Sequence, residues 1–300
     1  MRVAVTGAGG RLGRALIEAL ENAPYTGPFG PIPWTRPAFD VDAPARYPAL
    51  LDRARPEVIV HAAAWTDVDA CARDPELAMA RNGTATGALA QAAAERGVDL
   101  IFVSTNEVFD GHPAELRGYR PEDTTEPINA YGRSKLAGER LAQEAYPDAS
   151  AALGIVRTAW LYGPPGNDFP SKILAAAERA RNAGEPLKVV GDEVGSPTFT
   201  HDVAEAIVDL LGSGDVGGTH HVVNGGMASR ADWARELFRQ VGADVEIEEV
   251  PASTWPRAST PPAWAVLEQT PLPGGEPLRS WQAALADYTP TLLRAARAAR

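Results

Sequence analysis

The stretch "VAVTGAGGRLGRALIEAL", residues 3–20, joins a short apolar run to an amphipathic segment through a turn with glycines at positions 7, 10 and 13. A strand, a glycine turn and a helix in this order let the backbone approach a pyrophosphate closely, and the helix N-terminus offers it free N–H groups. The common fingerprint would place a glycine at position 12, which is Leu here, so the spacing is the GxxGxxG variant. The stretch predicts a dinucleotide site at Gly7, Gly10, Arg11, Leu12 and Gly13; the alternative is a tight turn without a ligand.

Short apolar runs alternate with longer amphipathic stretches from residue 1 to about residue 160. The runs 3–6, 32–35, 58–63, 100–105 and 154–160 are predicted strands, and 11–22, 75–96 and 131–146 are predicted helices. Such alternation is typical of a parallel sheet covered on both faces, so the fold class is α/β, a Rossmann-like doubly wound parallel sheet. The runs 186–191 and 219–224 are expected to extend this domain, with a helix at 202–211 between them. A smaller C-terminal substrate-binding lobe is expected from residues 161–185 and 225–300.

Composition and charge exclude several classes of protein. The 300 residues are 45% hydrophobic and carry a net charge of −11, which disfavours binding to nucleic acid or to an anionic membrane. We expect a cytoplasmic protein, because the N-terminus lacks a signal-peptide pattern and no run of about 18 apolar residues occurs. The single Cys71 has no disulfide partner, and no Cys/His cluster has the spacing of metal ligands, so no metal site is predicted.

The end of the second predicted strand should meet the adenosine ribose of the dinucleotide. An Asp or Glu at this point would favour NADH, whereas the sequence has Thr35 and Arg36, which favour the 2′-phosphate of NADPH. NADH remains possible, because Arg36 could also point into solvent. Asp40 and Val41 are placed to contact the adenine, although Asp40 could equally cap the next helix. NADPH is therefore the expected cofactor.

Tyr131 and Lys135 lie four residues apart in "AYGRSKLAGERLAQEA" and thus share one face of the predicted helix. A phenol is a poor acid or base near neutral pH, and the positive charge of Lys135 is expected to lower its pKa. Thr105 ends a predicted strand, where ligands of parallel sheets bind, and can polarise a substrate carbonyl. We interpret Thr105, Tyr131 and Lys135 as the catalytic residues of a carbonyl reductase, with Tyr131 and Lys135 also facing the cofactor.

The chain resembles the extended short-chain dehydrogenase/reductases, and within them the dTDP-4-dehydrorhamnose reductases. The resemblance covers about residues 1–210 and is carried by "TGAGGRLG", "RPEVIVHAAAWTDVDACARDPELA", "ARNGT", "VSTNEVFDG", "INAYGRSKLAGE", "VRTAWLYG" and "GSPTFTHDVA". It implies that Ala62, Ala63 and Ala64 pass behind the nicotinamide half of the cofactor, with Asn82 as a buttress. It also implies that Thr66, Val68 and Trp160 contact the substrate, although Trp160 could instead be a core residue.

The sequence departs from this family at two places. The reductases usually have Asp and Tyr where this chain has Asn106 and Glu107, and the sugar-nucleotide dehydratases have Asp and Glu. Asn106 has no titratable proton, so elimination would lack its acid. We expect Asn106 and Glu107 to hydrogen-bond sugar hydroxyls instead. In the smaller lobe the chain has "PPAWAVL", residues 261–267, in place of the family's Arg-Pro-x-x-Ser-x-Leu.

The resemblance implies an oxidoreductase of dTDP-rhamnose biosynthesis, which reduces the C4 ketone of a 4-dehydro-6-deoxy nucleotide sugar, with dTDP-4-dehydro-L-rhamnose as the expected substrate. One alternative is a nucleotide-sugar epimerase or dehydratase that retains bound NAD. Another is a non-catalytic, cofactor-binding regulatory subunit. The sequence leaves open the nucleotide base, the stereochemistry of the product and whether the chain forms a homodimer.

Overall fold

A six-stranded parallel sheet forms the larger part of the computed structural model, which describes residues 1–113, 115–147, 151–273 and 276–298. Its strand order is β10-β5-β4-β3-β1-β2, and the fold class predicted from the sequence is confirmed. The strands are β1 (Val3–Thr6), β2 (Ile32–Trp34), β3 (Val58–His61), β4 (Asp99–Thr105), β5 (Leu153–Thr158) and β10 (Gly218–His221). Thr6 is in register with Trp34 and with His61, so the carboxyl ends of neighbouring strands meet at one edge of the sheet.

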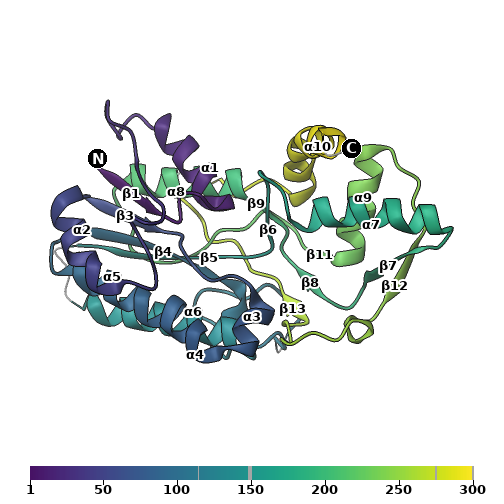
Figure 1. Ribbon diagram of the computed structural model, residues 1–300, viewed down its shortest axis with the longest axis horizontal. Helices are drawn as coiled ribbons and strands as arrows, with labels where there is room; N and C mark the ends of the chain where they lie inside the picture. The colour runs from purple at the N-terminus through teal and green to yellow at the C-terminus, as the bar shows by residue number, and fades with distance from the viewer. Residues whose placement is uncertain (114, 148–150, 274–275, 299–300) are drawn as a thin grey trace.

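Helices cover both faces of this sheet (Figure 1). The helices α1 (Arg11–Glu21) and α8 (Thr200–Ser213) pack on one face, where Leu16 and Ile207 belong to the same buried cluster as Val5 and Val60 of the sheet. The helices α2 (Tyr47–Ala54), α5 (Ala85–Ala94) and α6 (Ala130–Ala145) pack on the other face. Burial on both faces explains why the strands are continuous apolar runs. None of the helices within the described ranges combines the length and the apolar character needed to cross a membrane.

The helix predicted at residues 75–96 is interrupted. It consists of α4 (Pro75–Ala78), a π-helical segment η2 (Met79–Thr84) and α5, and the shorter helix α3 (Val68–Arg73) precedes it. A π-segment widens the helix locally and is common at functional sites. Here it contains Asn82, whose buried side chain reaches the backbone of Trp65 in the loop after β3. Periodicity alone did not predict this change of helix type.

The smaller lobe is built around α7 (Phe169–Ala183), α9 (Arg230–Val241) and α10 (Trp281–Ala298), which lie to the right in Figure 1. Their shared core includes Trp233, Leu237 and Leu285. Short strand pairs complete the lobe and connect it to the sheet: β6 (Leu161–Tyr162) with β9 (Thr198–Phe199), and β8 (Val194–Gly195) with β11 (Ala228–Ser229) and β13 (Trp264–Ala265).

The prediction that both late apolar runs extend the large sheet is half wrong. Gly218–His221 does join it as β10, beside β5. The run 186–191 forms β7 (Leu187–Val190) instead, which pairs with β12 (Ile247–Val250) in the smaller lobe. The side chains of β7 alternate between buried and exposed, as expected for a strand with one covered face, whereas a central parallel strand is buried on both.

Candidate active site

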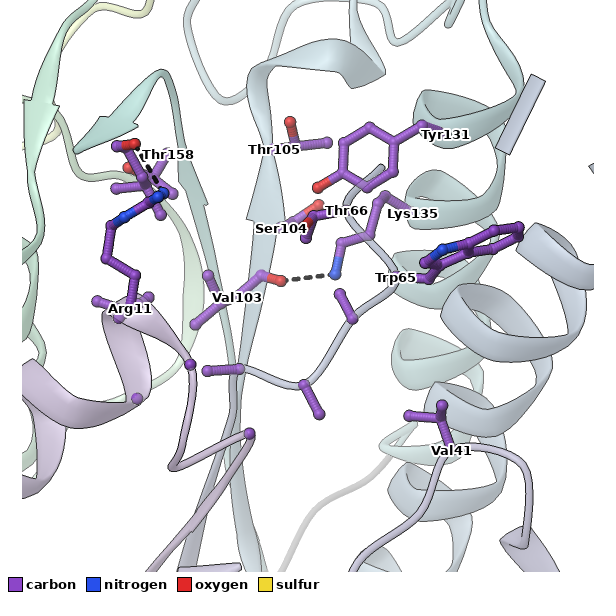
Figure 2. Close-up of a pocket in the computed structure, with 18 of the residues that line it drawn as sticks. Arg11, Val41, Trp65, Thr66, Val103, Ser104, Thr105, Tyr131, Lys135 and Thr158 are labelled. Carbon is purple, nitrogen blue, oxygen red and sulfur yellow. Dashed lines mark hydrogen bonds between the residues drawn. The ribbon is translucent and has the colours of Figure 1, made fainter. Parts of the chain in front are cut away.

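A cavity of about 600 Å³ opens along the edge where the carboxyl ends of the parallel strands meet. Its wall is formed by the glycine turn, by the residues that follow β2 and β3, and by the ends of β4 and β5 (Figure 2). Of the predicted site residues, those that line it are Gly7, Gly10, Arg11, Leu12, Gly13, Arg36, Val41, Ala62, Ala63, Ala64, Thr66, Val68, Thr105, Asn106, Glu107, Tyr131, Lys135 and Trp160. Among the described residues, Asp40 and Asn82 are the predicted ones that do not line it.

The glycine turn has the close packing that a dinucleotide site requires. Gly7 has a φ of +65°, and a Cβ there would lie 2.9 Å from the backbone of Ala63. A Cβ on Gly13 would lie 2.1 Å from the carbonyl oxygen of Gly7. Gly10 is the N-cap of α1, and residues 10–13 all line the cavity, so the N-terminus of this helix, with its free N–H groups, borders the cavity. These features fit the pyrophosphate of a dinucleotide.

Arg11 lines the cavity, but its guanidinium group binds the protein itself. It donates to the carbonyl oxygens of Leu161, Gly166 and Asn167 at 3.3, 2.9 and 3.0 Å. Figure 2 shows this side chain extending from the start of α1 toward the segment after β5. Arg11 therefore connects the glycine turn to the start of the smaller lobe.

Asn82 supports the loop after β3 from behind. Its Oδ1 accepts a hydrogen bond from the backbone N–H of Trp65 at 2.8 Å, and its Nδ2 donates to the Trp65 carbonyl at 3.0 Å and to Ser134 Oγ at 3.1 Å. The two bonds to Trp65 fix the end of the segment 62–64, which lines the cavity. This position matches the buttress that the resemblance implies.

At the adenosine end, Arg36 and Val41 line the cavity and Asp40 turns away from it. The Asp40 carboxylate accepts a hydrogen bond from the Asp42 backbone N–H at 3.1 Å and lies 3.3 Å from Arg36. Asp40 thus has contacts within its own loop, and its contact with adenine stays a prediction.

Lys135 is buried beneath the catalytic end of the cavity. Its Nζ donates to the Val103 carbonyl oxygen at 2.8 Å and lies 4.0 Å from the centre of the Phe102 ring (Figure 2). Burial lowers the pKa of Lys135 to about 7, and the carboxylate of Glu139, one helical turn away, opposes that change. Lys135 is thus poised to change charge near neutral pH.

Tyr131 stands beside Lys135, with its hydroxyl group directed toward Ser104 and Thr105 at the end of β4 (Figure 2). Burial raises the pKa of Tyr131, and Glu107 raises it further, whereas the Thr105 hydroxyl lowers it. The net change is upward, opposite to the lowering expected from Lys135. Burial of the phenol and the nearby Glu107 carboxylate cause this rise.

Asn106 and Glu107 follow Thr105 in a single turn, η3 (Asn106–Val108). The Thr105 hydroxyl oxygen accepts a hydrogen bond from the Glu107 backbone N–H at 3.2 Å. The Asn106 side-chain oxygen lies 3.4 Å from the same hydroxyl oxygen. The Glu107 carboxylate accepts from Asn129 Nδ2 at 2.6 Å, and Asn129 also caps the helix that carries Tyr131. Burial raises the pKa of Glu107, while Asn129 and the more distant Arg257 and Arg230 lower it.

Trp160 lines the cavity together with Thr66 and Val68, the other two residues that the resemblance assigns to the substrate. Its ring is held by Arg230, whose guanidinium carbon lies 3.4 Å from the ring centre, and stacks on Trp233. A Cβ on Gly195 would lie 2.5 Å from the Trp160 ring, so a glycine is needed there. Trp160 thus packs on the core of the smaller lobe and faces the cavity as well.

Several cavity residues were not predicted as site residues: Trp34, Phe39, Trp65, Arg81, Val103, Thr158, Ala159 and Leu161. Thr35, which the sequence places near the adenosine ribose, and Ser104, near the end of β4, line the cavity as well. Most of them end or follow a parallel strand, so the rule that located Thr105 could have found Thr158 and Ala159 as well. Arg81 lies in the middle of a helical stretch and has no local signal of this kind.

The lowered pKa of Lys135 predicts that the rate of the reaction falls as the pH becomes basic. Because the ammonium loses its proton as the pH rises through about 7, the charge that supports the phenol is lost above that pH. Tyr131 keeps its proton through this range, since its pKa is raised. We expect kcat/KM for ketone reduction to fall with a single basic limb that begins near pH 7. A profile that stays flat to about two pH units higher would contradict the assignment.

Comparison with known proteins gives a consistent result. Residues 1–293 match the family model described as the RmlD substrate binding domain. The chain is 38% identical over 293 residues to the dTDP-4-dehydrorhamnose reductase of Mycobacterium tuberculosis (strain ATCC 25618 / H37Rv), covering 95% of this chain and 91% of that protein.

Two solved structures extend the comparison. The dTDP-4-dehydrorhamnose reductase of Clostridium acetobutylicum superposes with a TM-score of 0.88 at 32% identity, over 98% of this chain and 100% of the other. The dTDP-4-dehydrorhamnose reductase of Bacillus anthracis, solved in complex with NADP, gives a TM-score of 0.85 at 30% identity, over 97% and 99% of the two chains. The similarity therefore includes both the sheet and the smaller lobe.

Proposed function

Because the chain belongs to the family of the RmlD substrate binding domain, the dTDP-4-dehydrorhamnose reductases, we propose that it reduces dTDP-4-dehydro-L-rhamnose to dTDP-L-rhamnose with NADPH. The chain is an oxidoreductase that acts on a nucleotide sugar. The observation that best supports the reaction is that one cavity contains both the glycine turn and the group Thr105, Tyr131 and Lys135.

We infer the roles of these side chains from their positions. A bound reduced nicotinamide would supply the hydride for C4 of the sugar. The Thr105 hydroxyl, at the carboxyl end of β4, orients the carbonyl oxygen of the sugar by a hydrogen bond. Tyr131 keeps its proton at neutral pH because its pKa is raised, and it gives that proton to the oxygen at C4 as negative charge develops there. We infer that the Lys135 ammonium group, which lies beside Tyr131 (Figure 2), stabilises the phenolate that remains.

NADPH is preferred over NADH in this proposal because Arg36 lines the adenosine end of the cavity. A 2′-phosphate needs a cation at that place, whereas free ribose hydroxyls favour an acid. The structure of the Bacillus anthracis relative, which contains NADP, supports the same choice. We further infer a cytoplasmic location, in keeping with a nucleotide-sugar substrate.

The reaction is tested by mixing the protein with NADPH and a panel of 4-dehydro nucleotide sugars and following the loss of the absorbance of reduced nicotinamide. The panel should vary the base and the configuration at C5. We expect the fastest turnover with dTDP-4-dehydro-L-rhamnose. Binding of NADPH without turnover of any sugar would favour the regulatory subunit instead.

Glu107 provides a test of the sugar contacts. A carboxylate accepts stronger hydrogen bonds from hydroxyl groups than an amide does, so Glu107→Gln should raise KM for the sugar about tenfold and leave NADPH affinity unchanged. The matched control is Glu126→Gln, because Glu126 is exposed and does not line the cavity. An unchanged KM in Glu107→Gln would show that the sugar does not contact this carboxylate.

A further inference from the structure

Four charged side chains meet at the adenosine end of the cavity. Arg81 donates two hydrogen bonds to the Asp42 carboxylate, from Nε to Oδ1 at 2.6 Å and from an Nη to Oδ2 at 2.7 Å. Arg36 lies 3.3 Å from Asp40 and 3.7 Å from Asp42. Arg36 and Arg81 both line the cavity. Asp42 thus stands between two arginines and is bound much more closely by one of them.

The two arginines differ in how firmly they are held. The Arg81 side chain is 25% exposed, lies over the Trp65 ring at 5.2 Å and forms a two-pronged bond whose planar geometry suits a carboxylate. The Arg36 side chain is 65% exposed, and its ion pairs with described residues are the two longer ones, to Asp40 and Asp42. Exposed pairs of this kind contribute little. Arg36 is therefore the cation that a bound phosphate can recruit.

Asp42 is the group that can oppose this recruitment. Arg81 and Arg36 hold the pKa of Asp42 below its ordinary value, so the carboxylate stays charged at neutral pH. A carboxylate at this edge of the sheet attracts Arg36 and repels a 2′-phosphate. If Asp42 lost Arg81, Arg36 would be its nearest remaining cation among the described residues.

We propose that Arg81 is a positioning residue for cofactor selectivity: by clamping the Asp42 carboxylate it leaves the Arg36 guanidinium group available to the 2′-phosphate of NADPH. The inference rests on the proposed function, in which this cavity binds NADPH. Arg81 acts through Asp42 and Arg36, and its contribution is absent for NADH, which carries no 2′-phosphate.

The test measures the affinity of the whole protein for NADPH and for NADH by calorimetry, without any sugar. In Arg81→Met, the Kd for NADPH should rise about fivefold to tenfold and the Kd for NADH should stay within about twofold. In the double variant Arg81→Met with Asp42→Asn, the affinity for NADPH should return to within about twofold of the original, because Asp42 no longer has a charge that attracts Arg36 or repels the phosphate.

The matched control is Asp52→Asn. Asp52 forms a similar two-pronged bond with Arg96 in the same domain, but neither residue lines the cavity, so both Kd values should stay unchanged. An unchanged NADPH to NADH ratio in Arg81→Met would overturn the proposal. A double variant as weak as Arg81→Met would overturn it too, because Arg81 would then contact the phosphate itself.

Failure of the inference can be told apart from failure of the proposed function. Protein that binds neither dinucleotide would overturn both. If the protein binds NADPH and reduces the sugar, but Arg81→Met leaves the ratio of the Kd values for NADPH and NADH unchanged, only the inference is overturned. Thermal unfolding of each variant shows whether a lost affinity reflects a lost fold.

Discussion

Replacing Tyr131 by Phe should lower kcat for reduction of the sugar ketone by about 10²- to 10⁴-fold, the usual contribution of a general acid, and leave the Kd for NADPH unchanged. The phenol is buried, points toward Thr105 and keeps its proton at neutral pH, so among the described residues it is the group best placed to protonate the oxygen at C4. Phe preserves the ring and its packing and removes the proton. The measurement is single-turnover oxidation of NADPH at saturating sugar.

Tyr146→Phe is the matched control, because Tyr146 ends the same helix α6. Its hydroxyl donates to the Val98 carbonyl oxygen at 2.7 Å, and neither Tyr146 nor Val98 lines the cavity. This variant should keep kcat close to the original value. If Tyr131→Phe retained full activity while Tyr146→Phe did as well, the proton would have to come from another group, and the catalytic assignment would fail.

The largest expected loss of stability comes from Glu139→Gln. Glu139 and Arg157 are both buried, and Arg157 donates two hydrogen bonds to the carboxylate, at 3.0 and 2.7 Å. Removing one charge of a buried pair leaves the other without compensation, which costs about 3–5 kcal/mol of the free energy of unfolding. Chemical denaturation of the two proteins measures this difference.

The same substitution should also affect Lys135. Because Glu139 raises the pKa of Lys135, the loss of the Glu139 charge should move the basic limb of kcat/KM to lower pH.

The double variant Glu139→Leu with Arg157→Met removes both charges and should recover much of the lost stability, since an apolar pair can replace a buried ion pair. If Glu139→Gln were as stable as the original protein, the ion pair between Glu139 and Arg157 would not stabilise the fold as its geometry indicates.

The parts of the fold and site that the sequence predicts are those with a local pattern. The glycines at positions 7, 10 and 13 predict the close turn because a side chain at any of them would crowd nearby backbone atoms. Tyr131 and Lys135 are predicted as neighbours by helical periodicity alone, and Thr105 is predicted at the cavity by its place at the end of a strand. The structure brings these residues to one cavity.

The parts that the sequence does not predict depend on contacts between distant segments. The partner of β7 is β12, about 60 residues later, and an apolar run carries no information on which sheet it joins. The π-segment at Met79–Thr84 carries Asn82, which bonds to Trp65 in a loop 17 residues earlier in the chain. The Arg81 clamp on Asp42 joins a helix to a loop 39 residues away, and the rise in the pKa of Tyr131 depends on the surrounding burial.

The central claim is that hydride passes from NADPH to C4 of the sugar, and an isotope measurement tests it most directly. The protein is incubated with dTDP-4-dehydro-L-rhamnose and NADPH carrying deuterium at both positions of the nicotinamide C4, and the sugar product is examined by NMR. We predict one deuterium at C4 of dTDP-L-rhamnose and one oxidised cofactor for each product molecule. A sugar product without deuterium, formed while the cofactor stays reduced, would contradict this account and would indicate an epimerase or dehydratase that recycles its hydride.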